Sequence, residues 1–169
     1  FEYFLRKICE FCDKKGISKP KYIVGRTGTL VLEKEQVGKF DLENTQKIAE
    51  IARRYGVGIK EHNVDYDHPD DLKQRFESGV SAVNIAPEFG VIESKAICDY
   101  CDENNLPELK QKFLDLAYNS KKWRKWLKRP DVTTQEEKAI IAGHYVFSHP
   151  EFAELKKQMG PEVDDYIKN

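Results

Sequence analysis

The stretch that decides the fold runs from Gly58 to Ile97 and reads GIKEHNVDYDHPDDLKQRFESGVSAVNIAPEFGVIESKAI. Each half of it is an apolar segment that leads directly into polar side chains able to do chemistry. The first segment is followed by His62, Asp65 and Tyr66, and the second by Asn84 and Glu88. Functional sites of parallel α/β proteins lie at the carboxyl ends of strands, so we expect the two clusters to form one shared site.

Strands alternate with helices along the first hundred residues. Apolar, β-branched runs predict strands at 21–24, 57–61 and 80–85, and helical periodicity predicts helices at 1–15, 41–55, 69–78 and 91–103. Asp41 is a suitable N-cap for the second helix, and Gly56 a suitable stop. The alternation predicts βαβ units and a parallel sheet.

The C-terminal third shows helical patterns only. A helix is predicted at 107–118, and residues 120–128 carry the KKWRKWL segment. Two capping boxes, Thr133 with Glu136 and Ser148 with Glu151, predict two further helices. A (β/α)8 barrel usually needs about 250 residues, so three strands would be its last three. We therefore expect 1–105 to be the C-terminal βα units of a barrel, and 106–169 a helical extension packed on it. The start at Phe1, within an amphipathic pattern, leads us to expect that an N-terminal part is missing.

Bulk composition excludes several classes of protein. The chain has 169 residues and a net charge of −1, from 28 basic and 29 acidic side chains. It therefore lacks the excess of positive charge that is typical of nucleic-acid-binding proteins. No apolar run approaches the roughly 20 residues that cross a bilayer. No signal peptide is visible, so the cytoplasm is the expected compartment.

The four cysteines form two C-x-x-C pairs, Cys9 with Cys12 and Cys98 with Cys101. Two such pairs are a familiar zinc signal. Here both pairs fall inside predicted helices, far apart in the sequence, rather than on the turns that present thiolates to zinc. We expect them to be small apolar residues of helix faces in a reducing compartment.

Several polar residues have both a functional and a structural interpretation. His62 could be a metal ligand, a general acid or base, or a donor to a sugar oxygen, and Asp65 could orient it or simply hold the loop. Glu88 could handle protons or bind metal, or could be a carboxylate favoured at a helix start. Arg26, in a glycine-flanked turn, could hold a phosphate or carboxylate, and Asn84 could bind a hydroxyl.

These motifs resemble a known family. EHNVDY at 61–66, AVNIAPEFGVIESKAI at 82–97 and KKWRKW at 121–126 resemble the accessory, non-catalytic subunit family of class II tagatose-1,6-bisphosphate aldolase. The similarity extends from Tyr22 to about Leu127. It implies an aldolase-type barrel, a role in carbohydrate metabolism, and a separate catalytic aldolase subunit as partner.

The chain departs from that family at two positions. The best-known members lack an acidic residue at the position of Glu88 and have lysine where Asn84 stands. One hypothesis is therefore an accessory subunit, and the alternative is a stand-alone, metal-dependent sugar or sugar-phosphate aldolase, epimerase or isomerase. A third is a scaffold whose polar residues only cap the strands.

The enzyme alternative assigns a role to each candidate residue. It would use Zn²⁺, Mg²⁺ or Mn²⁺, held by His62 and Glu88. Its catalytic residues would be His62, Asp65 and Glu88, and its substrate-binding residues Arg26, Asn84 and Tyr66. The expected partners are a catalytic aldolase subunit or further copies of the chain, together with a sugar phosphate.

Overall fold

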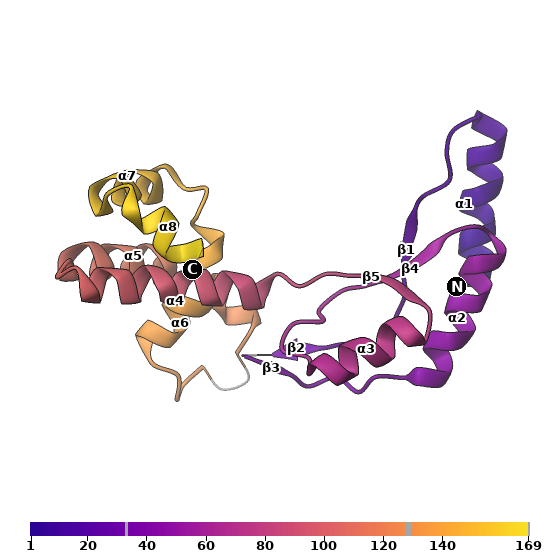
Figure 1. Ribbon diagram of the computed structural model, residues 1–169, viewed down its shortest axis with the longest axis horizontal. Helices are drawn as coiled ribbons and strands as arrows, with labels where there is room; N and C mark the ends of the chain where they lie inside the picture. Colours follow the sequence, from indigo (N-terminus) through magenta and orange to yellow (C-terminus); the bar gives the residue numbers. More distant parts are fainter. Residues whose placement is uncertain (33, 128–129, 169) are drawn as a thin grey trace. The chain divides into compact units, whose positions relative to one another are not determined.

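The computed structural model describes residues 1–32, 34–127 and 130–168, and the chain divides into two compact units, Phe1–Ile85 and Ala86–Asn169 (Figure 1). The fold is mixed α/β with one small parallel sheet, as the sequence predicts. Each unit has a hydrophobic core of its own. None of the helices in this described part is both long enough and apolar enough to span a membrane.

The first unit is built on three parallel strands in chain order, β1 (Tyr22–Val24), β4 (Gly58–Glu61) and β5 (Val80–Val83). Helices α2 (Leu42–Arg54) and α3 (Pro69–Glu77) connect them. All three strands lie within the ranges predicted from their apolar, β-branched runs. Because the strands are parallel and consecutive, their carboxyl ends meet at one edge of the sheet.

Helices cover one face of this sheet. Helix α1 (Glu2–Lys15) ends at Gly16, which has φ 64°, and α2 begins at Asp41, whose side chain accepts from the Asn44 amide at 3.0 Å. The cap at Asp41 was predicted from the sequence and is confirmed. The core between helices and sheet is formed by Leu5, Cys9, Ile48, Ala49, Ala52, Val57, Ile59 and Val80.

A short hairpin after β1 was not predicted. Strands β2 (Val31–Leu32) and β3 (Glu35–Gln36) pair antiparallel and make a separate two-stranded sheet. Strands of two residues carry too few positions for a period of two to be visible. A Cβ on Gly38 would lie 2.0 Å from the carbonyl oxygen of Gly28, so glycine allows the two sides of this loop to touch.

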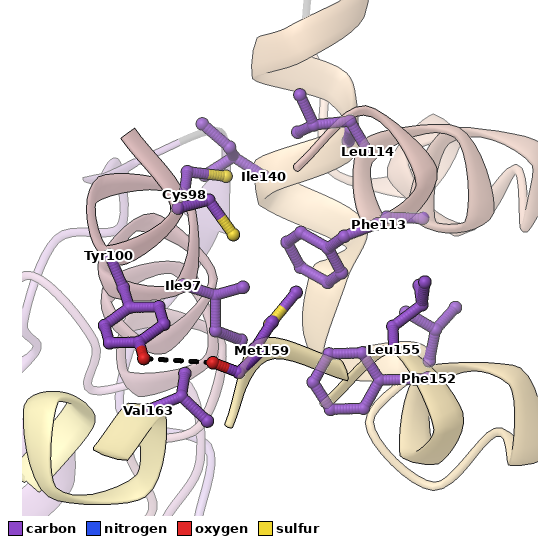
Figure 2. Close-up of a cluster of buried hydrophobic side chains, with 14 of the residues drawn as sticks. Ile97, Cys98, Tyr100, Phe113, Leu114, Ile140, Phe152, Leu155, Met159 and Val163 are labelled. Atoms are coloured by element: carbon purple, nitrogen blue, oxygen red, sulfur yellow. Dashed lines mark hydrogen bonds between the residues drawn. The ribbon is translucent and has the colours of Figure 1, made fainter. Parts of the chain in front are cut away.

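The second unit is helical. Its elements are α4 (Pro87–Glu103), α5 (Pro107–Asn119), η1 (Lys122–Lys125), α6 (Gln135–Ala142), η2 (Gly143–Tyr145), α7 (Pro150–Met159) and α8 (Glu162–Lys168). Figure 2 shows the core, in which Phe113 contacts Phe152 at 5.5 Å between ring centroids and the Tyr100 hydroxyl donates to the Met159 carbonyl at 3.0 Å. Packing of aromatic and aliphatic side chains therefore stabilises this unit.

Helix α4 differs from the sequence prediction in two respects. It begins at Pro87 rather than at residue 91, because proline is well suited to the first turn of a helix. It also packs with α5 and α6, through Ile97, Cys98 and Cys101, and so belongs to the second unit. The sequence assigned it to the first part, 1–105, because it follows a strand.

Helix starts in the second unit are shifted by one residue from the predicted boxes. The capping box is Thr134 with Glu137, and helix α7 is capped by the His149 ring, which accepts from the Glu151 amide at 3.3 Å. Trp123 packs on Ile141 and Ala142 of the same unit. The segment at 120–128 contains a 3-10 turn at Lys122–Lys125, and its last residue, Lys128, lies outside the described residues.

All four cysteines are buried helix residues. Cys9 and Cys12 lie on α1 in the first unit, and Cys98 and Cys101 on α4 in the second. Burial raises the pKa of the Cys98 thiol to about 12, and also raises the pKa of Cys101. A thiol that stays protonated at neutral pH is a poor nucleophile and a poor metal ligand.

Candidate functional site

An open hollow of about 480 Å³ lies at the carboxyl ends of β1 and β4. It is lined by the turn after β1, residues 24–30, together with Gly38, His62 and Asn63. Arg26 and His62 are its ionisable lining residues, and none of the described residues that line it is acidic. The hollow is therefore suited to a ligand that carries negative charge.

The strand register brings three of the predicted residues into one row. Val24 pairs with Lys60, so continuing the β1–β4 ladder by two residues places Arg26 beside His62. The β4–β5 ladder, continued by one residue, places His62 beside Asn84, whose amide donates to the Glu61 carbonyl at 2.9 Å. Residues on neighbouring strands at one level share a face of the sheet. We call Arg26, His62 and Asn84 the strand-end row.

Hydrogen bonds hold the loop that carries His62. The Thr29 hydroxyl donates to the His62 carbonyl at 2.7 Å, and the Gln36 side-chain amide donates to the Asn63 carbonyl at 2.7 Å. The Val64 amide donates to the Asn84 carbonyl at 3.2 Å. Thr29 and Gln36 belong to the segment with the unpredicted hairpin, so sequence reasoning missed both supports.

The same loop has an unusual backbone. Asn63 and Tyr66 have φ values of 58° and 59°, in the left-handed region that glycine usually occupies. Asparagine adopts this conformation readily, but for a bulky residue such as Tyr66 it costs roughly 1–2 kcal/mol. Such backbone conformations persist where the surroundings hold them and are frequent at functional sites.

The remaining residues of the first predicted cluster point elsewhere. Asp65 is fully buried, whereas His62 is exposed. Tyr66 lines a separate cavity of about 310 Å³, together with Asp67 and Arg75. Of the catalytic and substrate-binding residues predicted within this unit, the hollow thus brings together Arg26 and His62, and the ladder adds Asn84.

A buried arginine is the most informative residue that the sequence did not single out. Arg75 of α3 is 2% exposed, and its Nη1 donates to Glu61 Oε2 at 3.2 Å and its Nε to Asp67 Oδ2 at 2.5 Å. Its Cζ lies 4.5 Å from the centre of the Phe40 ring. Leu72, one turn earlier, is apolar and half-buried, and is a local signal that this helix face is turned inward.

Glu88 belongs to the second unit. It lies in the first turn of α4 and is half-buried, where the helix dipole favours a carboxylate. Its predicted participation in a site with His62 and Asp65 stays a prediction. Among the described residues, no group of three or more His, Cys, Asp or Glu side chains is arranged to hold a metal ion.

Comparison with known proteins gives one structural likeness. No family model matches the chain, and no curated protein matches it either. The X-ray crystal structure of the YdjI aldolase from Escherichia coli K12 matches with a TM-score of 0.38 and 14% sequence identity, over 92% of this chain and 44% of that one. The chain thus spans less than half of that structure.

Proposed function

We propose that the chain supplies the last three βα units of an aldolase-type (β/α)8 barrel. In this proposal it acts in carbohydrate metabolism as the accessory, non-catalytic subunit of a class II tagatose-bisphosphate-type aldolase. The observation that carries the proposal is the strand-end row, Arg26, His62 and Asn84, at the carboxyl ends of three consecutive parallel strands. Ligand sites of βα barrels are built at that end of the sheet.

The charges of the hollow support a sugar phosphate as its ligand. Arg26 is exposed, and a guanidinium group binds phosphate oxygens through two parallel hydrogen bonds. Lys60, on β4, lies two residues before His62 and pairs with Val24, which lines the hollow. Asn84 and His62 can bind sugar hydroxyls, because both offer a donor and an acceptor.

The carboxylates of the first unit support binding rather than catalysis. Glu61 is on the opposite face from His62 and is paired with Arg75, and Asp65 is fully buried. A general base must lie within hydrogen-bonding reach of the proton that it removes. The lining of the hollow contains Arg26 and His62 but, among the described residues, no carboxylate that could serve in this way.

Glu88 supports the alternative, a stand-alone, metal-dependent sugar or sugar-phosphate aldolase, epimerase or isomerase. It follows Asn84 by four residues, and the best-known members of the accessory family lack an acidic residue there. In this alternative His62 and Glu88 would hold Zn²⁺, Mg²⁺ or Mn²⁺. Such an ion would polarise the ketose carbonyl.

The deciding experiment uses protein expressed from the complete reading frame. It is mixed with a catalytic tagatose-bisphosphate aldolase subunit, and the aldolase rate and the half-life of that activity are measured. We expect no cleavage of ketose bisphosphates by the protein alone and a several-fold longer half-life in the mixture. Binding of tagatose 6-phosphate, measured by calorimetry, should weaken at least about tenfold in Arg26→Gln, because a charge-assisted hydrogen bond is lost.

The matched control is Arg54→Gln, which removes an exposed arginine that pairs with Glu2 on the helical side of the same unit. It should leave both results unchanged. Cleavage by the protein alone with added Zn²⁺, Mg²⁺ or Mn²⁺, lost in Glu88→Gln, would establish the alternative instead. A protein that neither cleaves, nor binds the sugar phosphate, nor affects the aldolase would contradict both.

A further inference from the structure

Arg75 joins two carboxylates that lie on either side of the His62 loop. Glu61 is the last residue of β4 and directly precedes His62, and Asp67 directly follows Tyr66. One guanidinium group donates to both, from Nη1 and from Nε. The loop 62–66 is therefore closed at its base by a single side chain, which we call the arginine clamp, consisting of Arg75, Glu61 and Asp67.

The clamp also fixes the direction in which His62 points. Successive side chains of a strand alternate between the two faces of the sheet. Glu61 is held on the side of α3, where it is fully buried, so Lys60 and His62 are turned to the other side. His62 lines the hollow together with Arg26.

Stability alone gives a poor account of the clamp. It places two carboxylates against one guanidinium, and Glu61 Oε1 is buried with no hydrogen-bond partner among the described residues. Buried ion groups of this kind can often be replaced by apolar side chains without loss of stability. A guanidinium group differs from an apolar side chain in that its planar fork fixes two acceptors in direction as well as distance.

We propose that Arg75 is a positioning residue, which holds both ends of the loop 62–66 and so presents His62 to the hollow. The clamp opposes the relaxation that the left-handed backbone of Asn63 and Tyr66 would otherwise undergo. Thr29 and Gln36 also restrain the loop, through hydrogen bonds to the His62 and Asn63 carbonyls. This inference rests on the proposed function only in that His62 is taken as a ligand-binding residue.

The test replaces the whole clamp rather than one member, because Arg75→Leu alone would leave two buried carboxylates unpaired. The triple variant Glu61→Leu, Asp67→Leu, Arg75→Leu removes all three charges together. Hydrogen exchange is followed by NMR at the Val64 amide, which bonds to the Asn84 carbonyl, and at the Ile59 amide inside the sheet. The His62 ring signal is recorded with and without inorganic phosphate. The control, Glu2→Leu with Arg54→Leu, removes an exposed ion pair of the same unit.

We expect the triple variant to fold, with Val64 exchanging at least tenfold faster, Ile59 unchanged, and the His62 signal shifted and broadened. Arg75→Lys, which keeps the charge but not the fork, should give an intermediate rate at Val64. Unchanged Val64 exchange and an unchanged His62 signal would overturn the proposal, and so would failure of the triple variant to fold, because the clamp would then be needed for stability. If the His62 signal of the wild type does not change when phosphate is added, the result counts against the proposed function. The exchange rates at Val64 and Ile59 still decide the role of Arg75.

Discussion

The two units differ in what they bury. Of the buried polar and charged residues among those described, Ser94 alone lies in the second unit, and the first unit holds Thr27, Thr45, Glu61, Asp65, Arg75 and Ser78. The second unit instead buries a large set of apolar side chains around Phe113, Phe152 and Met159 (Figure 2). Polar groups are costly to bury unless they are bonded, so their concentration in the first unit requires an explanation.

The explanation lies in where those polar residues are placed. Glu61, Asp65 and Arg75 lie in or against the loop that carries His62, and Thr27 lies in the turn that carries Arg26. The first unit thus uses the buried charges of Glu61 and Arg75 to fix the loop after β4, whereas the buried Thr27 hydroxyl makes no hydrogen bond among the described residues. The second unit uses its core for stability. Substitutions should therefore cost more stability in the second unit, and should alter the candidate site from the first.

The largest loss of stability is expected from Phe113→Ala in the second unit. The Phe113 ring is fully buried and contacts the rings of Phe147 and Phe152. Removing such a ring leaves a cavity and should lower the free energy of unfolding by about 3–5 kcal/mol. Denaturant unfolding followed by tryptophan fluorescence reports on this unit, because Trp123 and Trp126 both belong to it. The control Phe89→Ala, at a ring that is 61% exposed, should cost little.

A smaller loss is expected from Ile59→Ala in the first unit. Ile59 is 1% exposed and lies at the centre of the core between the sheet and helices α1 and α2. This core contains fewer large side chains, so we expect a loss of about 3 kcal/mol, towards the lower part of the range for such substitutions. Hydrogen exchange of the β4 amides measures it. A loss larger than that of Phe113→Ala would contradict the contrast between the two units.

The pH dependence of stability should also separate the units. Burial raises the pKa of Cys98 to about 12, from 9.0. In the folded state the thiol keeps its proton up to about pH 12, whereas in the unfolded state it loses the proton near pH 9. The contribution of the protonated Cys98 thiol to the free energy of unfolding is therefore fully present below pH 9. It is lost as the pH rises from 9 to 12. Denaturation of the second unit across this range should show a steeper decline for the wild type than for Cys98→Ala. Equal slopes would show that burial does not hold the proton on this thiol.

The parts of the fold that the sequence predicted depend on local signals. Helix α2 could be delimited because Asp41 caps it and Gly56 follows it, and both act through their own backbone neighbours. The parallel strands could be found because each is a short β-branched run beside a helical pattern. Arg26, His62 and Asn84 could be proposed because each directly follows such a run.

The parts of the fold and of the candidate site that the sequence did not predict depend on contacts between residues that are distant in the sequence. Arg75 is inward-facing because Glu61, fourteen residues earlier, accepts its hydrogen bond. Thr29 contacts the His62 carbonyl across 33 positions. Helix α4 joins the second unit because its buried face fits α5 and α6, which the alternation of strands and helices does not reveal. Periodicity within one element carries no information about such partners.

The smallest effect concerns the start of α6, where sequence and structure differ by one residue. The Thr134 hydroxyl accepts from the Glu137 amide at 3.1 Å, and the Glu137 carboxylate accepts from the Thr134 amide at 2.9 Å. Thr134→Ala removes the accepting hydroxyl and should lower the free energy of unfolding by about 1 kcal/mol. Thr133→Ala, at the position that the sequence pattern favoured, should cost less. Tryptophan fluorescence during denaturation measures both. A larger loss in the free energy of unfolding for Thr133→Ala would show that Thr133 caps the helix, as the sequence pattern predicted.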